Sequence, residues 1–327
     1  MRKAALTLFA LAAANYAAAQ LTEDASYSYE TASGTFTTIS LISGSGSTST
    51  DGTSALKESS TAWLLDGATV NFGNSGKTYT LSNTKFGYGN FSMGVKGDSV
   101  LNFGAGATDC INAKQGISNS YVSAVSADNK YTFGYANLTI NVDKDYAGKI
   151  ELPTIGCQAT GRVILNLNKE NALSATQNLR IFVAGSGKVE INASANQNMC
   201  WDARGNGYIF NVSNGATLFF KDMNLTGGTH KTTQTIDSLD GDILFVKSIV
   251  DSYDTDSLSL VLKKGTNATT FDFSFTNNTG SDLFMGEKTI NGVDYIYISN
   301  TQIPEPAEWA AIFGAVALAF AAYRRRK

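Results

Sequence analysis

A short motif recurs six times along the chain, and it restricts the possible folds more than any other feature. Each copy is an apolar residue, an asparagine and a second apolar residue, centred on Asn71, Asn102, Asn141, Asn166, Asn192 and Asn211. Successive asparagines are 31, 39, 25, 26 and 19 residues apart. Each copy lies in a short β-rich run bounded by Gly, Ser, Asn or Asp, which is typical of strands between turns. Repeats of about 20–50 residues indicate stacked coils.

The motif leaves two positions open for the asparagines. They would form a ladder at a corner of the coils, where Asn tolerates left-handed backbone geometry. Alternatively, strict strand alternation would point each Asn away from its two apolar neighbours. In either case the apolar neighbours stack inside, coil on coil.

A second alignment suggests the length of a coil. Asn102 and Cys110 match Asn192 and Cys200 at an offset of 90 residues, and Cys157 lies about halfway between the two cysteines. A repeat near 45 residues is best interpreted as two coils of about 22 residues each. The chain is therefore predicted to be all-β, with a right-handed parallel β-helix (a solenoid) over residues 20–239. A β-sandwich is the alternative.

The chain changes character beyond this region. Phe271–Phe275 and Tyr295–Ile298 alternate or run apolar, like paired strands of an antiparallel sheet. Residues 240–303 are therefore predicted to form a C-terminal β-module that closes the solenoid, because an open last coil would expose an aggregation-prone edge. The Ser/Thr/Gly-rich stretch Ser43–Ser54 is expected to be a loop or an irregular first coil.

Composition excludes several classes of function. Only 16% of the 327 residues are charged and the formal net charge is −3, whereas a general nucleic-acid binder carries a basic excess. His230 is the single histidine, which excludes metal sites built from several histidines.

The first 19 residues have the pattern of a secretory signal peptide. A basic start, Arg2-Lys3, precedes the unbroken apolar run Ala4–Ala14, and Ala17 and Ala19 supply an A-x-A cleavage site. An apolar run of 11 residues is too short to span a bilayer. We therefore expect residues 1–19 to be removed on export.

Residues 304–327 have the pattern of a sorting tail. Pro304-Glu305-Pro306 precedes residues 310–322, which carry no polar side chain, and the cations Arg324, Arg325, Arg326 and Lys327 follow. Trp309 and Tyr323 bracket the apolar run, as amphipathic rings do at membrane interfaces. The sequence predicts a short transmembrane helix over 309–323 with the basic cluster on the cytoplasmic side.

This tail closely resembles the PEP-CTERM sorting signal, which consists of a Pro-Glu-Pro motif, a transmembrane helix and an Arg-rich cluster. The resemblance covers only residues 304–327. It implies processing by exosortase, a membrane-embedded enzyme of Gram-negative bacteria that make extracellular polysaccharide. It also implies an inner-membrane anchor, followed by transfer to the cell surface or extracellular matrix.

Acidic residues were weighed as catalytic groups of the kind that β-helix hydrolases and lyases use. The candidates are Asp109, Asp202 with Arg204, and Asp222, but they show no paired acids at a repeating offset, which favours solvated corner residues. Asn141-Val-Asp143-Lys-Asp145 resembles the start of a calcium loop, but Tyr146 stands where the turn glycine belongs. We therefore predict no catalytic, cofactor or metal site.

Cysteines and aromatic residues form two further groups of candidates. Cys110, Cys157 and Cys200 are predicted to be three free thiols, because equivalent positions two strand spacings apart lie beyond disulfide reach. A pair of one of them with His230 for catalysis is disfavoured, since no Asp-His context supports it. The aromatic-glycine clusters 86–91 and 131–135 are expected to pack at corners, and sugar stacking is the alternative.

The sequence thus predicts a non-catalytic exported surface or matrix protein. Its expected partners are signal peptidase and an exosortase-type enzyme, and extracellular polysaccharide stays open as a third. A secreted β-helix carbohydrate-active enzyme and a glycan-binding adhesin are the alternatives, the former on fold analogy alone.

Overall fold

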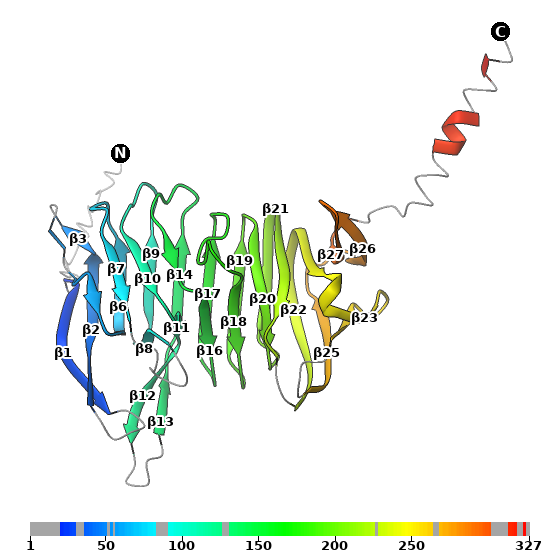
Figure 1. Ribbon diagram of the computed structural model, residues 1–327. Coiled ribbons are helices and arrows are strands. Elements are labelled where there is room, and N and C mark those ends of the chain that lie inside the picture. The colour runs from blue at the N-terminus through cyan, green and yellow to red at the C-terminus, as the bar shows by residue number, and fades with distance from the viewer. Residues whose placement is uncertain are drawn as a thin grey trace, which may run out of the picture.

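The fold is nearly all β, with parallel strand pairing through most of its length (Figure 1). The computed structural model describes residues 20–30, 36–50, 53–54, 56–82, 91–125, 131–225, 228–263, 268–301, 313–318 and 323–324. Parallel pairing in the body confirms the prediction of a parallel all-β fold. The alternative of an antiparallel β-sandwich is wrong.

Three parallel ladders organise the body of the molecule. Ladder A contains β6 (Trp63–Phe72), β9 (Ser99–Phe103), β14 (Leu138–Val142), β17 (Arg162–Leu167), β19 (Lys188–Ala193) and the first part of β21 (Tyr208–Met223). Ladder B contains the first part of β6, then β8 (Met93–Gly97), β11 (Ile117–Ser118), β16 (Thr154–Cys157), β18 (Leu179–Val183), β20 (Gln197–Ala203) and the second part of β21. Ladder C contains β5 (Ser59–Ser60), β7 (Thr78–Leu81), β10 (Cys110–Ala113) and β15 (Ile150–Glu151).

Ladders A and B together form a closed ring of eleven parallel strands. The ring closes because β6 pairs with both β8 and β9, and β21 pairs with both β19 and β20. The sequence predicted stacked coils and did not predict this closure. Along the chain, β9, β10 and β11 visit ladders A, C and B in that order, and β14, β15 and β16 repeat the order.

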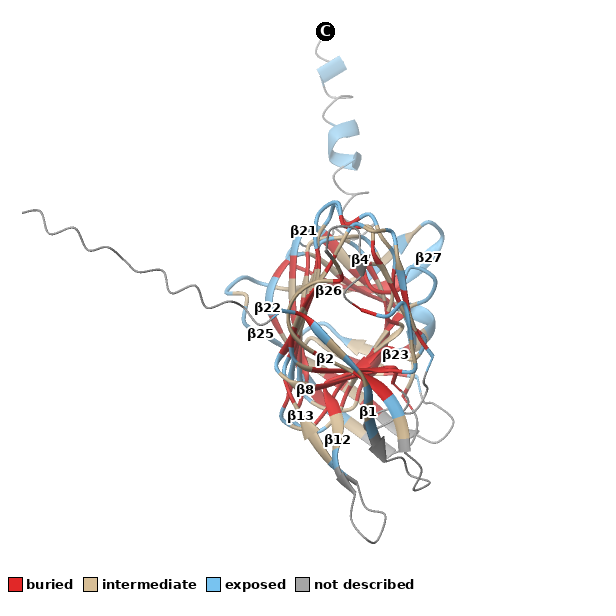
Figure 2. Cartoon of the chain, turned by 90° about the vertical axis from the view of Figure 1, so that its left-hand side faces the viewer, coloured by how far each residue is buried: buried red, intermediate tan, exposed pale blue. Residues whose placement is uncertain are grey.

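The core lies between the ladders, where apolar side chains from alternate strand positions point inward. In β9 and β14, buried and half-buried residues alternate along the strand. Phe72 and Phe103 stack with ring centroids 4.1 Å apart, and Trp201 packs edge-on against Tyr208 and Phe220. Figure 2, viewed from the β1 end, shows the buried residues gathered on the inner side of the strands.

An antiparallel hairpin of β1 (Thr22–Glu30) and β2 (Phe36–Ser47) begins the fold, and β2 then pairs with β6 in parallel. Two short strands follow, β3 (Ser49–Thr50) and β4 (Thr53–Ser54). The expectation of a loop or irregular coil over Ser43–Ser54 is therefore wrong at its start, because β2 continues to Ser47.

The last part of the fold is built on one long strand, β22 (Gly228–Val246). It pairs in parallel with both parts of β21, and the predicted boundary between 239 and 240 falls inside it. Its first part pairs in parallel with β25 (Ala268–Asn277), and its second part pairs antiparallel with β27 (Val293–Ser299). The two apolar segments predicted to pair with each other therefore pair with β22 instead. The other elements are η1 (Lys247–Ile249), β23 (Val250–Asp254), β24 (Ser259–Leu262) and β26 (Phe284–Ile290).

A second hairpin, β12 (Ser120–Val125) with β13 (Tyr131–Tyr135), projects from the body (Figure 1). It contains the described aromatic-glycine cluster, so the prediction that residues 131–135 pack at a corner is wrong. Residues 86–90 of the other cluster lie outside the described residues. The described residues of the tail include a short exposed helix over 313–318, and no helix among the described residues is long and apolar enough to cross a membrane.

Candidate functional site

The six motif asparagines form one continuous row on the outer side of ladder A. Asn71, Asn102, Asn141, Asn166, Asn192 and Asn211 are direct partners in successive strand pairs. Their apolar neighbours point inward, and Val70 and Phe72, for example, are 0% and 4% exposed. Strand alternation therefore places the asparagines. The alternative of a left-handed corner is wrong, since none of the six has a positive φ.

Side-chain hydrogen bonds run along this row in a single direction. Each asparagine from Asn102 onward donates from Nδ2 to Oδ1 of the preceding one, with N···O distances of 2.8, 2.7, 2.6, 2.7 and 2.9 Å. The Ser238 hydroxyl donates to Oδ1 of Asn211 at 3.1 Å and so extends the row. The amides thus satisfy one another across the strands, as partly buried polar groups must.

A shallow hollow of about 270 Å³ lies over one end of this row. Its lining is Asn166, Asn168, Asn192, Ala193, Ser194, Asn211, Ser213 and Ser238. Most of these polar groups are already bonded to each other, including the Ser194 hydroxyl, which donates to Oδ1 of Asn168 at 2.6 Å. The row therefore stabilises the outer side of the sheet and offers a ligand little unused hydrogen-bonding capacity.

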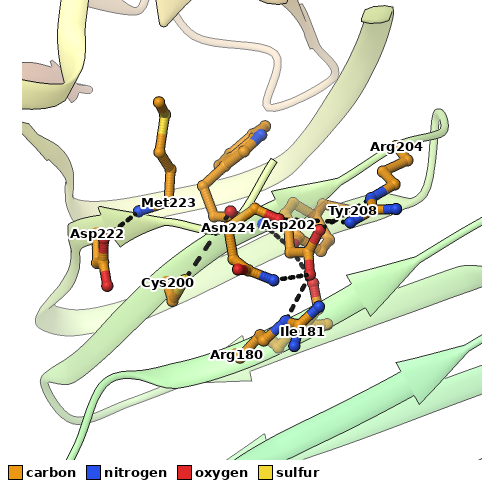
Figure 3. Close-up of polar contacts among 10 residues, drawn as sticks. Arg180, Ile181, Cys200, Asp202, Arg204, Tyr208, Asp222, Met223 and Asn224 are labelled. Carbon is orange, nitrogen blue, oxygen red and sulfur yellow. Dashed lines mark hydrogen bonds and ion pairs between the residues drawn. The ribbon is translucent and has the colours of Figure 1, made fainter. Parts of the chain in front are cut away.

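A charged cluster occupies the outer side of ladder B and is centred on Asp202 of β20 (Figure 3). Asp202 is 0% exposed. Its Oδ2 accepts from Nε of Arg180 at 2.5 Å and from Nδ2 of Asn224 at 3.2 Å, and its Oδ1 accepts from Nε of Arg204 at 3.2 Å. Two guanidinium groups and one amide thus bond a single buried carboxylate.

Burial dominates the ionisation of this cluster. Burial raises the pKa of Asp202, and the attraction of Arg180, its hydrogen bond and the bond from Asn224 offset that effect only in part. Burial likewise raises the pKa of the Cys200 thiol to about 12, which leaves the thiol protonated near neutral pH. Cys200 is therefore no nucleophile in this environment.

A cleft of about 570 Å³ adjoins the cluster. It is lined by Pro153, Thr154, Thr176, Gln177, Asn178, Arg180, Cys200, Asp222 and Asn224. Arg180 belongs to both features: its Nε binds the buried Asp202 while the side chain is 36% exposed. The cleft is polar and contains charges of both signs.

A second buried carboxylate, Asp109, lies just before β10. It is 0% exposed and accepts hydrogen bonds from the hydroxyls of Thr48 and Ser75, each at 2.6 Å, and from the backbone N–H of Lys77 at 3.2 Å. Burial acts to raise the pKa of this carboxyl, but the hydrogen bonds outweigh it and the pKa is lowered.

The three acidic candidates therefore have different environments. Asp109 and Asp202 are not the solvated corner residues that the sequence favoured, because their partners come from other strands and cover them. Asp222 is exposed, as expected, and its Oδ1 accepts from the N–H of Met223 at 2.7 Å. The equivalence of Cys110 and Cys200 is also wrong, since Cys110 lies in ladder C and Cys200 in ladder B.

All three cysteines are free thiols, in agreement with the prediction of no intramolecular disulfide. Cys157 in β16 and Cys200 in β20 are separated by β18, as the two-coil interpretation of this interval requires. Burial raises the pKa of Cys157 to about 12. His230 stacks on Phe271 of β25, with ring centroids 5.4 Å apart.

Asp143 and Asp145, the proposed start of a calcium loop, form a local turn instead. Oδ1 of Asp143 accepts from the N–H of Asp145 at 2.8 Å, and Tyr146 is buried behind them. Within the described ranges, no three His, Cys, Asp or Glu side chains gather in a way that could hold a metal ion.

Most of the sorting signals lie outside the described residues. This is the case for Ala17, Ala19, Pro304, Glu305 and Pro306. In the basic cluster only Arg324 is described, in a helical turn with Tyr323, while Arg325, Arg326 and Lys327 are not.

Comparison with known proteins finds no match among family models, curated proteins or solved structures. The function must therefore be inferred from the residues of this chain.

Proposed function

We propose that this chain is a non-catalytic exported protein of the cell surface or extracellular matrix, sorted through residues 304–327 by an exosortase-type system. The observation that carries the proposal is the order of Pro304-Glu305-Pro306, the apolar run 310–322 and the basic cluster 324–327. The signal pattern with Ala17 and Ala19 directs the chain to signal peptidase. Residues 309–323 then anchor it in the inner membrane until the tail is processed.

Two structural observations support a passive role. The amide groups of the row on ladder A bond one another rather than a cleft. The carboxylate of Asp202 is bonded by Arg180, Arg204 and Asn224, so it lacks the unengaged position that a general acid or base needs to reach a substrate.

The winding of the body is proposed to be that of a right-handed parallel β-helix. In support, the chain visits ladders A, C and B in a repeated order, and each step along the asparagine row advances by one strand. The ring of eleven strands closes only where β6 and β21 each contribute to both ladders.

Expression of the full chain in a Gram-negative host, with and without an exosortase, tests the proposed sorting. The wild-type protein should reach the surface or medium only when the enzyme is present, and mass spectrometry should find it without Arg324–Lys327. Replacement of Pro304, Glu305 and Pro306 by alanine should leave the protein in the inner membrane, whereas Glu308→Ala, just outside the motif, should be processed normally. Recovery of Arg324–Lys327 in extracellular material would contradict the proposal.

A further inference from the structure

The cleft on the outer side of ladder B has a floor that is fixed by strand register. Thr154, Arg180, Cys200 and Asp222 are direct partners on four successive strands, β16, β18, β20 and β21. Neighbouring strands lie about 4.8 Å apart, so these side chains form a row of regular spacing. Gln177 and Asn178, just before β18, contribute to the lining of the cleft.

Arg180 is held in place by a group that no ligand can reach. Its Nε donates to Oδ2 of Asp202 at 2.5 Å, and Asp202 is 0% exposed. Its two terminal nitrogens donate no hydrogen bond to any other described residue. A guanidinium fixed at one edge and unengaged at the other presents donors that lose little freedom when they bind a ligand.

The rest of the cleft adds unengaged donors and acceptors. Across the described ranges, the side-chain amides of Gln177 and Asn178 and the hydroxyl of Thr154 have no hydrogen-bond partner. Asp222 uses one carboxylate oxygen for the N–H of Met223 and has the other unengaged. This contrasts with the asparagine row on ladder A, where the amides are bonded to each other.

The charges of the cluster cancel. Arg180 and Arg204 carry two positive charges, and Asp202 and Asp222 carry two negative charges. At the rim, Glu151 accepts from the hydroxyl of Thr176 at 3.1 Å and is paired with Lys149 at 3.0 Å. A cleft without net charge does not attract a phosphate or a polyanion over a distance, but it offers acceptors as well as donors at close range.

We propose that this cleft binds a neutral oligosaccharide. A sugar hydroxyl both donates and accepts, so a chain of neutral sugars pairs with a carboxylate, a guanidinium and amides at the same time. Pro153 and Cys200 are the only lining residues without a strongly polar side chain, so an apolar ligand would leave the polar groups unsatisfied. The volume of about 570 Å³ lies within the usual range for small-molecule sites, about 300–1,000 Å³. This inference goes beyond the proposed function, because the cleft binds its ligand whether or not the tail is processed.

Calorimetric titration of the purified full chain in detergent tests the inference. The probes are neutral tetrasaccharides of glucose, mannose and galactose, with tetragalacturonate as the anionic comparison. At least one neutral tetrasaccharide should bind at millimolar concentration or below, and more tightly than tetragalacturonate.

Variants place the binding in the cleft. Asn178→Ala and Asp222→Ala each remove a group that has little structural work, so both should fold and should weaken binding by about tenfold, or about 1.4 kcal/mol. Asn74→Ala is the matched control, because Asn74 is exposed in the turn between β6 and β7, away from the cleft. It should leave the affinity unchanged.

Three outcomes would overturn the inference: no binding of any neutral tetrasaccharide at millimolar concentration, tighter binding of tetragalacturonate, or equal weakening by Asn74→Ala. None of them bears on tail processing, which is measured in cells.

Discussion

Asp109 and Asp202 are both fully buried carboxylates, but the groups that bond them differ in charge. Asp109 accepts from two hydroxyls and a backbone N–H, all of them neutral. Asp202 accepts from two guanidinium groups and an amide. The pKa of Asp109 is lowered and that of Asp202 is raised, although Asp202 alone has cationic partners.

The difference shows that opposite charge is not sufficient to stabilise a buried carboxylate. Desolvation of Asp202 is costly, and the attraction of two partly exposed arginines, 36% and 30% exposed, is weakened by nearby water. Neutral donors placed by the backbone bond Asp109 at short distance and require no second charge to lose its water. The following predictions test how strongly each arrangement stabilises the fold.

The largest effect is expected for Asp202→Ala. Removal of this carboxylate leaves Arg180 and Arg204 facing each other without a counter-charge, so the free energy of unfolding should fall by about 3 kcal/mol, a typical cost of breaking a buried ion pair. Chemical denaturation measures this change. Asp222→Ala removes an exposed carboxylate at the same outer face and should change stability by no more than about 0.5 kcal/mol. Equal effects of the two substitutions would contradict a structural role for Asp202.

Asp109→Ala should cost about 2 kcal/mol, because it leaves the buried donors of Thr48, Ser75 and Lys77 without their acceptor. The same denaturation experiment measures it, with Asp145→Ala, at an exposed position, as the control. A cost above that of Asp202→Ala would reverse the proposed order of the two sites.

Asn166→Ala extends the comparison to a polar row that contains no charge. Asn166 donates to Asn141 and accepts from Asn192, so its loss breaks two hydrogen bonds at a half-buried position. We expect a loss of about 1 kcal/mol, because water can reach the groups that are left. Asn71→Ala, at the end of the row, breaks only the bond from Asn102 and should cost less. Equal costs would show that the row does not act through its hydrogen bonds.

The asparagine row was the part of the fold that the sequence predicted best. Its residues repeat because every turn places the same position of a strand in ladder A, and alternation fixes which side each residue faces. The length of the turns could not be predicted as well. The 39 residues between Asn102 and Asn141 include the projecting hairpin of β12 and β13, and ladder C has no strand after β15. A constant 45-residue repeat therefore placed Cys110 and Cys200 in the same corner, although they lie in different ladders.

The cluster around Asp202 could not be predicted, because it has no local motif. Arg180, Asp202 and Asn224 are 22 residues apart in each step, a spacing that matches two successive turns. That spacing becomes a signal only once the turn length in this part of the chain is known. Burial of Asp202 was missed for the same reason, since alternation in β20 places it on the outer side and its cover comes from side chains of neighbouring strands.

The smallest effect is expected in the pH dependence of stability, where the two carboxylates should act in opposite directions. The folded pKa of Asp109 lies below the unfolded value of 3.8, so its stabilising contribution is present above 3.8 and is lost as the pH falls through the folded value. The folded pKa of Asp202 lies above 3.8, so its contribution is present below 3.8 and is lost as the pH rises through the folded value. Asp109→Asn and Asp202→Asn replace each group with a neutral one of the same shape. The stability difference between wild type and Asp109→Asn should therefore shrink on acidification, and that between wild type and Asp202→Asn should shrink as the pH rises. Denaturation curves recorded across this range measure both differences, and slopes of the same sign would show that the arginines stabilise the ionised form of Asp202 more than burial opposes it.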